Sequence, residues 1–311
     1  MGKISIVSRN STTFTRTREL DEDAFRASLQ RFVESEIAVY LASGGSGEAN
    51  ALTIDELRRV YRIGVEVCQG QLPVYANIPE VKNAQEAIDL SRLAIDADVD
   101  VVNFYGPAGL HGYVPTDAEL TLYFDTVLSA VEHPAVLAPN PIQGYTPKPS
   151  VIAAMCDTYP HVTAVNLVGL NGDAYFLELR ELIKRDDVAL AVPLPGSHNM
   201  FDLGASALVS NLANILPRTL RQYVDRYECG DDVGMGKTYA DLLRFERYVR
   251  RWPGARWQKM AMRVLKLPGG EGGLRLPYLM PPDEEVERFA RGLLALNVPE
   301  LDDLAQAAGL A

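Results

Sequence analysis

The chain has 311 residues, of which 47% are hydrophobic and 23% are charged, and its formal net charge at pH 7 is −11. This composition is typical of a globular protein, and the acidic balance excludes a general affinity for nucleic acid or an anionic membrane. Without a long apolar run or the apolar segment of a signal peptide, we expect a cytoplasmic protein. The three widely spaced cysteines, Cys68, Cys156 and Cys229, are expected to be buried free thiols.

Strand-like and helix-like segments alternate along the first three quarters of the chain. After a short strand at 3–7, the pattern predicts strands at 37–42, 73–77, 99–105, 134–138, 162–168, 188–192 and 207–210. Several of them are continuous runs of Val, Ile, Leu and Ala, which is typical of parallel strands covered on both faces. Seven strands are clear after residue 7, so the element at 3–7 is either separate or the first of eight.

Helices are predicted between these strands and after them. We expect them at 20–34, 53–68, 83–95, 116–131, 149–158, 173–184, near 199–203 and from 217, with Thr53 and Glu56 forming a capping box. The alternation favours an α/β fold of the (β/α)8 TIM barrel type over a doubly wound sheet, because no G-x-G-x-x-G follows the first strand.

The pattern becomes purely helical after residue 230. Helices are predicted at 239–251, 256–265, 284–296 and 300–308, and the glycine-rich segment Gly230–Lys237 is expected to be a loop between helices. The sequence therefore predicts a barrel domain at 1–228 and a C-terminal helical appendage at 229–311.

A glycine-rich turn follows the strand at 37–42. It runs Ser43-Gly-Gly-Ser-Gly-Glu48 and leads to the helix start at Thr53. Such a turn offers backbone N–H groups and a hydroxyl at the carboxyl end of a sheet, where α/β proteins bind anionic ligands. We therefore expect Gly45, Ser46 and Glu48 to contact a small anionic ligand.

Other polar side chains follow later strands. Because the ligand site of a (β/α)8 barrel lies at the carboxyl ends of its strands, further candidates are Tyr105, His111, Asn140, Gln143, Asn166, His198 and Ser210. The histidines can act as acids or bases near pH 7, or they are loop residues that face solvent. Their spacing indicates no metal site, and we expect no metal and no cofactor.

The order of these motifs resembles the dihydrodipicolinate synthase / N-acetylneuraminate lyase family over residues 3–300. Gly44-Gly-Ser-Gly-Glu48 matches that family's Gly-Thr-Thr-Gly-Glu turn, Leu137-Ala-Pro-Asn-Pro141 lies where it has Leu/Tyr-Asn-x-Pro, and Leu274-Arg-Leu-Pro-Tyr278 matches its Arg-x-Pro signature. The resemblance implies a TIM barrel with C-terminal helices and a homo-oligomer, either a dimer or a tetramer. It also implies a lyase that holds a 2-keto acid, usually pyruvate, as a Schiff base.

This chain departs from the family pattern at the reactive positions. Asn166 stands at the position of the Schiff-base lysine, and Ala138 at that of the proton-relay tyrosine. Gln143 stands where some members have a carboxylate-binding arginine, and Gly45 replaces the first threonine of the turn, while Ser46 keeps the second hydroxyl. An asparagine cannot form an iminium, so Schiff-base aldol chemistry is excluded at position 166. Its amide can donate a hydrogen bond to a keto or enolate oxygen, an interaction typically worth about 3–4 kcal/mol.

Three interpretations remain. In the first, the protein is a lyase of aldolase, hydro-lyase or decarboxylase type, in which Asn166 and Ser46 polarise a keto acid or related carbonyl compound and Tyr105, His111 or His198 moves protons. In the second, it is an inactive family member that binds a small carboxylate ligand or a protein partner. In the third, Lys82 is a relocated Schiff-base lysine.

Overall fold

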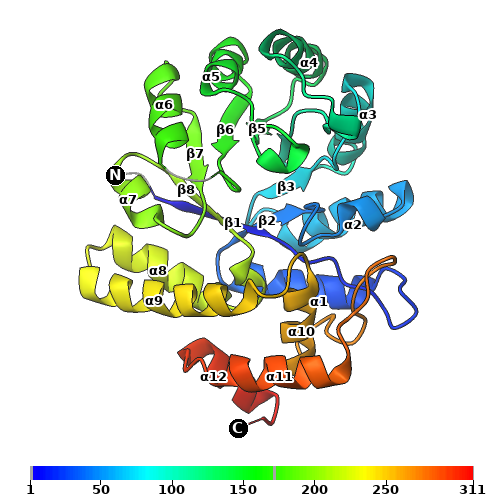
Figure 1. The fold of residues 1–311 in the computed structure, drawn as a ribbon, viewed down its shortest axis with the longest axis vertical. Coiled ribbons are helices and arrows are strands. Elements are labelled where there is room, and N and C mark those ends of the chain that lie inside the picture. Colours follow the sequence, from blue (N-terminus) through cyan, green and yellow to red (C-terminus); the bar gives the residue numbers. More distant parts are fainter. Residues whose placement is uncertain (1–2, 171–172, 311) are drawn as a thin grey trace. The chain divides into compact units, whose positions relative to one another are not determined.

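The computed structural model describes residues 3–170 and 173–310, and among them eight parallel strands form a closed barrel in chain order (Figure 1). The strands are β1 (Ser5–Arg9), β2 (Ala38–Leu41), β3 (Val74–Asn77), β4 (Val101–Phe104), β5 (Ala135–Leu137), β6 (Val162–Asn166), β7 (Ala189–Val192) and β8 (Ala207–Ser210). The predicted (β/α)8 TIM barrel is confirmed, and the element expected at 3–7 is the first of the eight strands.

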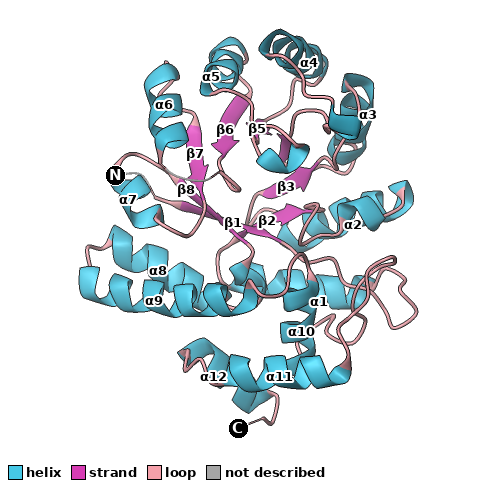
Figure 2. Ribbon diagram, in the orientation of Figure 1, coloured by secondary structure: helices cyan, strands magenta, loops and turns pink. Residues whose placement is uncertain are grey.

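Among the described residues, an α-helix follows each strand, as the colouring by secondary structure shows (Figure 2). These helices are α1 (Glu22–Glu34), α2 (Ile54–Cys68), α3 (Ala84–Ile95), α4 (Asp117–Ala130), α5 (Pro149–Thr158), α6 (Ala174–Leu182), α7 (Ser197–Asp202) and α8 (Pro217–Glu228). The predicted capping box opens α2, because Thr53 Oγ1 accepts the Glu56 N–H at 3.2 Å and Glu56 Oε2 accepts the Thr53 N–H at 2.9 Å.

Four further α-helices follow in the described part of the chain: α9 (Asp232–Val249), α10 (Arg256–Val264), α11 (Asp283–Leu294) and α12 (Pro299–Ala307). The predicted loop at Gly230–Lys237 is wrong, because α9 begins inside it. Asp231 caps this helix by accepting the Gly234 N–H at 2.9 Å. A Cβ at Gly234 would lie 1.9 Å from Asp231 Oδ2, so the glycine that suggests a loop instead lets the cap approach the helix.

The chain forms two compact units. The first unit is Met1–Ser5 with Pro73–Val209, and the second is Ile6–Leu72 with Ser210–Ala311. Within the first unit, α3–α6 lie on the outer side of strands β3–β7 (Figure 1). Within the second unit, α8 and α9 pack side by side as a helical hairpin. The division at residue 228 stays a prediction.

The strands supply much of the core. Every residue of β2, β4 and β8 is buried, which fits parallel strands covered on both faces. In the register of β3 and β4, Asn77 is the partner of Asn103, and both side chains are buried. Amide side chains therefore interrupt the apolar strands at their carboxyl ends.

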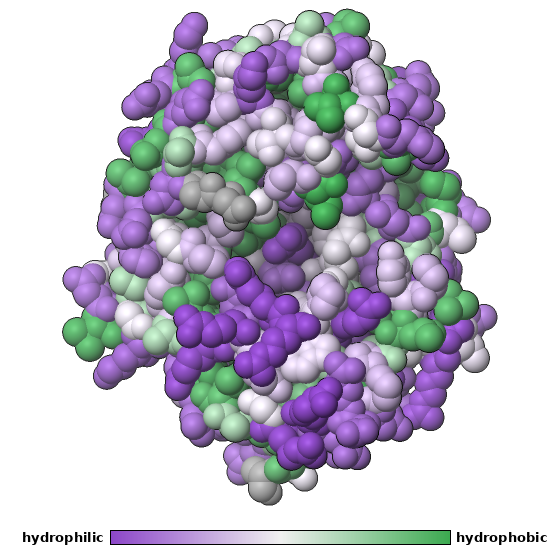
Figure 3. Space-filling view, viewed as in Figure 1, coloured by the Kyte–Doolittle hydropathy of each residue, from purple (hydrophilic) through white to green (hydrophobic). Residues whose placement is uncertain are grey.

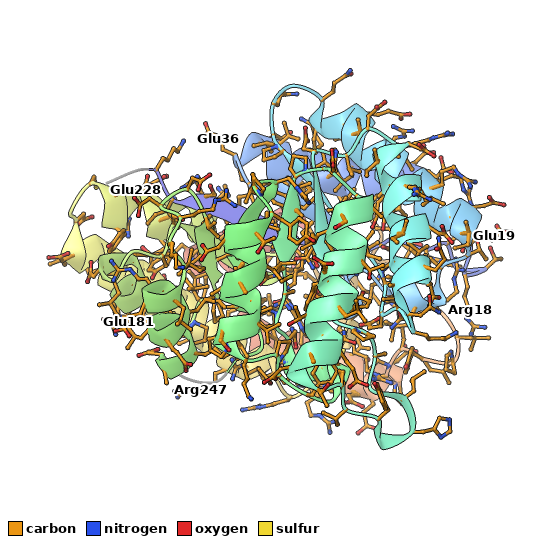
Figure 4. All side chains as sticks on the ribbon, turned by 90° about the horizontal axis from the view of Figure 1, so that it is seen from above. Arg18, Glu19, Glu36, Glu181, Glu228 and Arg247 are labelled. Carbon is orange, nitrogen blue, oxygen red and sulfur yellow. The ribbon has the colours of Figure 1, made fainter. Side chains whose placement is uncertain are left out.

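The surface carries the charge. On the face shown in Figure 3, hydrophilic residues surround small, separate hydrophobic patches. Charged residues such as Arg18, Glu19, Glu181 and Arg247 are exposed and extend outward from the ribbon (Figure 4). Among the described residues, no helix is both long enough and apolar enough to cross a membrane.

The prediction that all three cysteines are buried is wrong for Cys229. Cys68 and Cys156 are buried, but Cys229 is exposed. It is the residue that caps the carboxyl end of α8, at the start of the short turn that leads into α9. Its position in a connecting turn explains its exposure.

Candidate functional site

The turn after β2 lies in the second unit and is organised around Ser43. The Gly47 N–H donates to the Ser43 carbonyl at 2.9 Å and to Ser43 Oγ at 3.1 Å, and Thr12 Oγ1 donates to the Gly47 carbonyl at 2.7 Å. A Cβ at Gly47 would lie 2.6 Å from the Ser43 nitrogen, so only glycine fits there. No described group accepts the N–H of Gly45 or Ser46.

Ser46 belongs to a buried hydrogen-bond network. Its side chain is 4% exposed, and Ser46 Oγ accepts from Gln258 Nε2 at 2.8 Å and from Asn211 Nδ2 at 3.3 Å. The hydroxyl of Ser11 donates to Gln258 Oε1 at 2.5 Å, and the Ser11 N–H donates to Asn214 Oδ1 at 2.9 Å. The network thus ties the turn to the segment after β1, to the segment after β8 and to α10.

The carboxylate of Glu48 contacts Lys259 and Arg275 in the C-terminal part of the chain. Its backbone adopts a left-handed conformation (φ 51°), and its side chain is buried. Glu48 Oε2 accepts the Arg275 N–H at 3.1 Å, and Oε1 lies 3.6 Å from Lys259 Nζ, which also donates to the Thr12 carbonyl. Burial raises the pKa of Glu48 and lowers that of Lys259, while the charge of each partner acts in the opposite direction.

Arg275 anchors the start of α2. Its guanidinium binds the Glu56 carboxylate through two hydrogen bonds of 2.8 and 3.0 Å, and it lies 4.5 Å from the centre of the Phe14 ring. Hydrogen bonding by Arg275 lowers the pKa of Glu56 to about 2. Ser210, at the end of β8, is also buried, and its hydroxyl oxygen accepts the Leu212 N–H at 3.1 Å.

The first unit carries the amide candidates. Asn166 ends β6 and is 6% exposed, and its Oδ1 accepts the Val168 N–H at 3.1 Å. No described group accepts its amide hydrogens. Asn140 donates to the Val168 carbonyl at 2.8 Å and accepts the Ile142 N–H at 3.0 Å. Gln143 is 4% exposed, and both polar atoms of its side chain lack a hydrogen-bond partner in the described chain.

The candidates for proton transfer differ in exposure. Tyr105 follows β4 and is half-buried, with its carbonyl accepting the Tyr123 hydroxyl at 3.2 Å. His198 is half-buried within α7. His111 is exposed in the loop after β4 and has a left-handed backbone (φ 54°). Within residues 3–170 and 173–310, no three His, Cys, Asp or Glu side chains could together hold a metal ion.

Sequence reasoning missed the residues that support the turn from a distance, namely Ser11, Gln258, Lys259 and Arg275. One signal points to two of them. The run Trp257-Gln-Lys-Met-Ala-Met262 places a polar pair inside an otherwise apolar helix segment, and both polar residues are fully buried. Buried polar side chains need partners, so such a pair predicts specific contacts, although it does not identify them.

Comparisons with known proteins agree over most of the chain. A model of the dihydrodipicolinate synthetase family matches residues 4–295. An uncharacterised DapA-like lyase of Rhizobium meliloti is 25% identical over 297 residues, which cover 94% of this chain and 95% of that protein. The 4-hydroxy-tetrahydrodipicolinate synthase of Nitratidesulfovibrio vulgaris (strain DP4) is 27% identical over 238 residues, which cover 75% of this chain and 78% of that protein.

Solved structures share the fold. The dihydrodipicolinate synthase of Aquifex aeolicus superimposes with a TM-score of 0.85 at 19% identity, covering 95% of this chain and 99% of that one. YagE of E. coli K12, a prophage protein of the dihydrodipicolinic acid synthase family crystallised with pyruvate, superimposes with a TM-score of 0.83 at 19% identity. That match covers 94% of this chain and 98% of that one.

Proposed function

Because the chain belongs to the dihydrodipicolinate synthetase family, we propose that it is a lyase for a small 2-keto acid or related carbonyl compound that forms no Schiff base at position 166. The reaction would be of aldolase, hydro-lyase or decarboxylase type. The observation that carries this proposal is Asn166, a buried amide at the end of β6 whose hydrogens no described group accepts.

The geometry of Asn166 supports a role as a hydrogen-bond donor. Its carbonyl oxygen is held by the Val168 N–H, so the amide orientation is fixed and the NH₂ group is left to donate. A donor fixed in advance stabilises negative charge that develops on a keto oxygen during enolisation or C–C cleavage. Within the second unit, the turn that contains Ser46 is the proposed binding site for a carboxylate.

The distribution of lysines also supports a mechanism without an imine. None of the eight strands contains a lysine. Six of the seven lysines are exposed, including Lys82, and the seventh, Lys259, is engaged by Glu48 and the Thr12 carbonyl. A lysine that forms imines is usually activated by a desolvated pocket or a second cation, which an exposed position such as Lys82 does not supply.

Exchange of the C3 hydrogens of pyruvate tests this proposal. YagE was crystallised with pyruvate, which makes pyruvate a suitable first probe. In deuterated buffer, enolisation replaces the C3 hydrogens with deuterium, which proton NMR detects. We expect the wild type to accelerate exchange and Asn166→Ala to slow it by about 100-fold, because one oxyanion donor is lost. Tyr105→Phe, His198→Ala and His111→Ala identify the group that moves the proton.

The controls separate the three interpretations. Borohydride reduction in the presence of pyruvate should leave the mass of the protein unchanged. A reduced adduct on Lys82 or Lys259 would contradict the proposal. Pyruvate binding without exchange, equal in wild type and Asn166→Ala, would instead favour an inactive protein that binds carboxylates.

A further inference from the structure

We infer that Gln258 of α10 is a positioning residue that fixes the Ser46 hydroxyl so that its proton is offered to the anionic group of the ligand. This inference rests on the proposed function, in which the turn receives the carboxylate. Every residue that carries it belongs to the second unit. It makes α10 part of the ligand site, although this helix begins more than 200 residues after the turn in the sequence.

The hydrogen bonds that the Ser46 hydroxyl accepts leave it able only to donate to a further group. A hydroxyl can accept two hydrogen bonds and donate one. Ser46 Oγ already accepts from Gln258 Nε2 at 2.8 Å and from Asn211 Nδ2 at 3.3 Å, and no described group accepts its proton. The hydroxyl is therefore restricted to donating, which suits a carboxylate, carbonyl or phosphate oxygen and excludes an ammonium group.

The lengths of the two contacts fix the orientation of the Gln258 amide. The distance from Ser11 Oγ to Gln258 Oε1 is 2.5 Å, within the range for O–H···O bonds but shorter than the usual N–H···O distance. The 2.8 Å contact with Ser46 fits an N–H donor. A rotated amide would place nitrogen at the shorter contact, so Ser11 holds Gln258 as a donor toward Ser46.

The network is buried and anchored beyond the turn. Gln258 is fully buried and Ser11 is 1% exposed, so water does not compete for these groups. Ser11 is held in turn by Asn214, whose Nδ2 donates to the Arg9 carbonyl at 2.9 Å and to the Asn211 carbonyl at 2.8 Å. A buried glutamine is costly unless its polar atoms have partners, and here Oε1 is paired with Ser11 and Nε2 with Ser46.

A double-mutant cycle measured with pyruvate tests the inference. Calorimetric titration would give the affinity of the wild type, Ser46→Ala, Gln258→Met and the double variant, and thermal unfolding would give their stability. Met260→Leu is the matched control, because Met260 is a fully buried neighbour on α10. The second variant is Gln258→Glu, made both in the wild type and in Ser46→Ala. Its carboxylate only accepts, so it would take up the Ser46 proton while keeping the shape of the side chain.

We expect Ser46→Ala to weaken pyruvate binding about tenfold or more, because a hydrogen bond to a charged group is lost. Gln258→Met should weaken it about fivefold, but should have no further effect in the Ser46→Ala background, and Met260→Leu should leave affinity unchanged. Gln258→Glu should weaken binding more in the wild-type background than beside Ser46→Ala, where only its charge acts.

Several results would overturn the inference. If Gln258→Met binds pyruvate as tightly as the wild type, Gln258 has only a structural role. The same holds if the effects of the two single variants on pyruvate affinity multiply in the double variant. Pyruvate binding by the wild type with either result would refute the inference and leave the proposed function intact. A borohydride adduct would refute the proposed function. If the effects of Ser46→Ala and Gln258→Met were also non-additive, the inference about Gln258 would stand. A wild type that does not bind pyruvate would refute both.

Discussion

Single glycines in the turn after β2 have different roles. A Cβ at Gly47 would overlap the backbone of Ala42 and Ser43, whereas a Cβ at Gly45 would meet nothing within 4 Å. Gly45 is also exposed, and its φ is not positive. The hydroxyl that the family carries at this position is therefore absent for reasons other than steric exclusion. The turn has no room for a side chain at Gly47 but has room for one at Gly45.

Paired substitutions test this difference. We expect Gly45→Thr to fold with a melting temperature close to that of the wild type, because the added side chain enters open space. Gly47→Ala should destabilise the protein by about 1–3 kcal/mol, since backbone atoms must move to admit the methyl group. Thermal unfolding followed by circular dichroism measures both. Equal destabilisation by the two substitutions would contradict the assignment.

Sequence patterns among neighbouring residues predicted most helices and strands, but no pattern predicted the contacts between residues that are far apart in the sequence. The capping box at Thr53 predicted the start of α2, and the apolar runs predicted the strands, because both depend on neighbouring residues. The start of α9 was missed because glycines suggested a loop, whereas the Asp231 cap stabilises the helix there. Asn166 and Ser46 could be proposed from motif order. Their partners could not, because nothing in the sequence connects Ser46 with Gln258.

The link between α2 and Arg275 gives a prediction about pH. Arg275 lowers the pKa of Glu56 to about 2, so the stabilisation by this carboxylate is complete above the unfolded pKa near 4.5 and is lost as pH falls toward 2. We expect Glu56→Gln to lower the free energy of unfolding by on the order of 2–3 kcal/mol at pH 7.

Urea unfolding at several pH values measures this effect. The difference between the wild type and Glu56→Gln should stay constant from pH 7 to about pH 5 and shrink between about pH 4.5 and pH 3. Asp55→Asn is a suitable control, because Asp55 sits in the same helical turn but pairs only with Arg58 at the surface. A difference that does not depend on pH would show that the Arg275 pair contributes through packing alone.

The oligomeric state of the protein, a dimer or a tetramer, stays a prediction. The loop after β4 exposes Leu110, Tyr113 and Val114, each at least 50% accessible. Neighbouring exposed apolar side chains of this kind are typical of contact surfaces. We expect light scattering after size exclusion to give two or four times the 34.2 kDa mass of one chain. A mass of one chain at micromolar concentration would contradict the dimer or tetramer.

The contact between Ser11 and Gln258 also limits how early during synthesis the glycine-rich turn can form all its contacts. These residues are 247 positions apart, so the hydrogen bond that orients Ser46 closes most of the chain into one loop. A nascent chain that ends at residue 209 contains the whole continuous segment of the first unit but none of α10. During synthesis the glycine-rich turn therefore lacks its contact with Gln258 until α10 has been made, more than 200 residues after the turn itself.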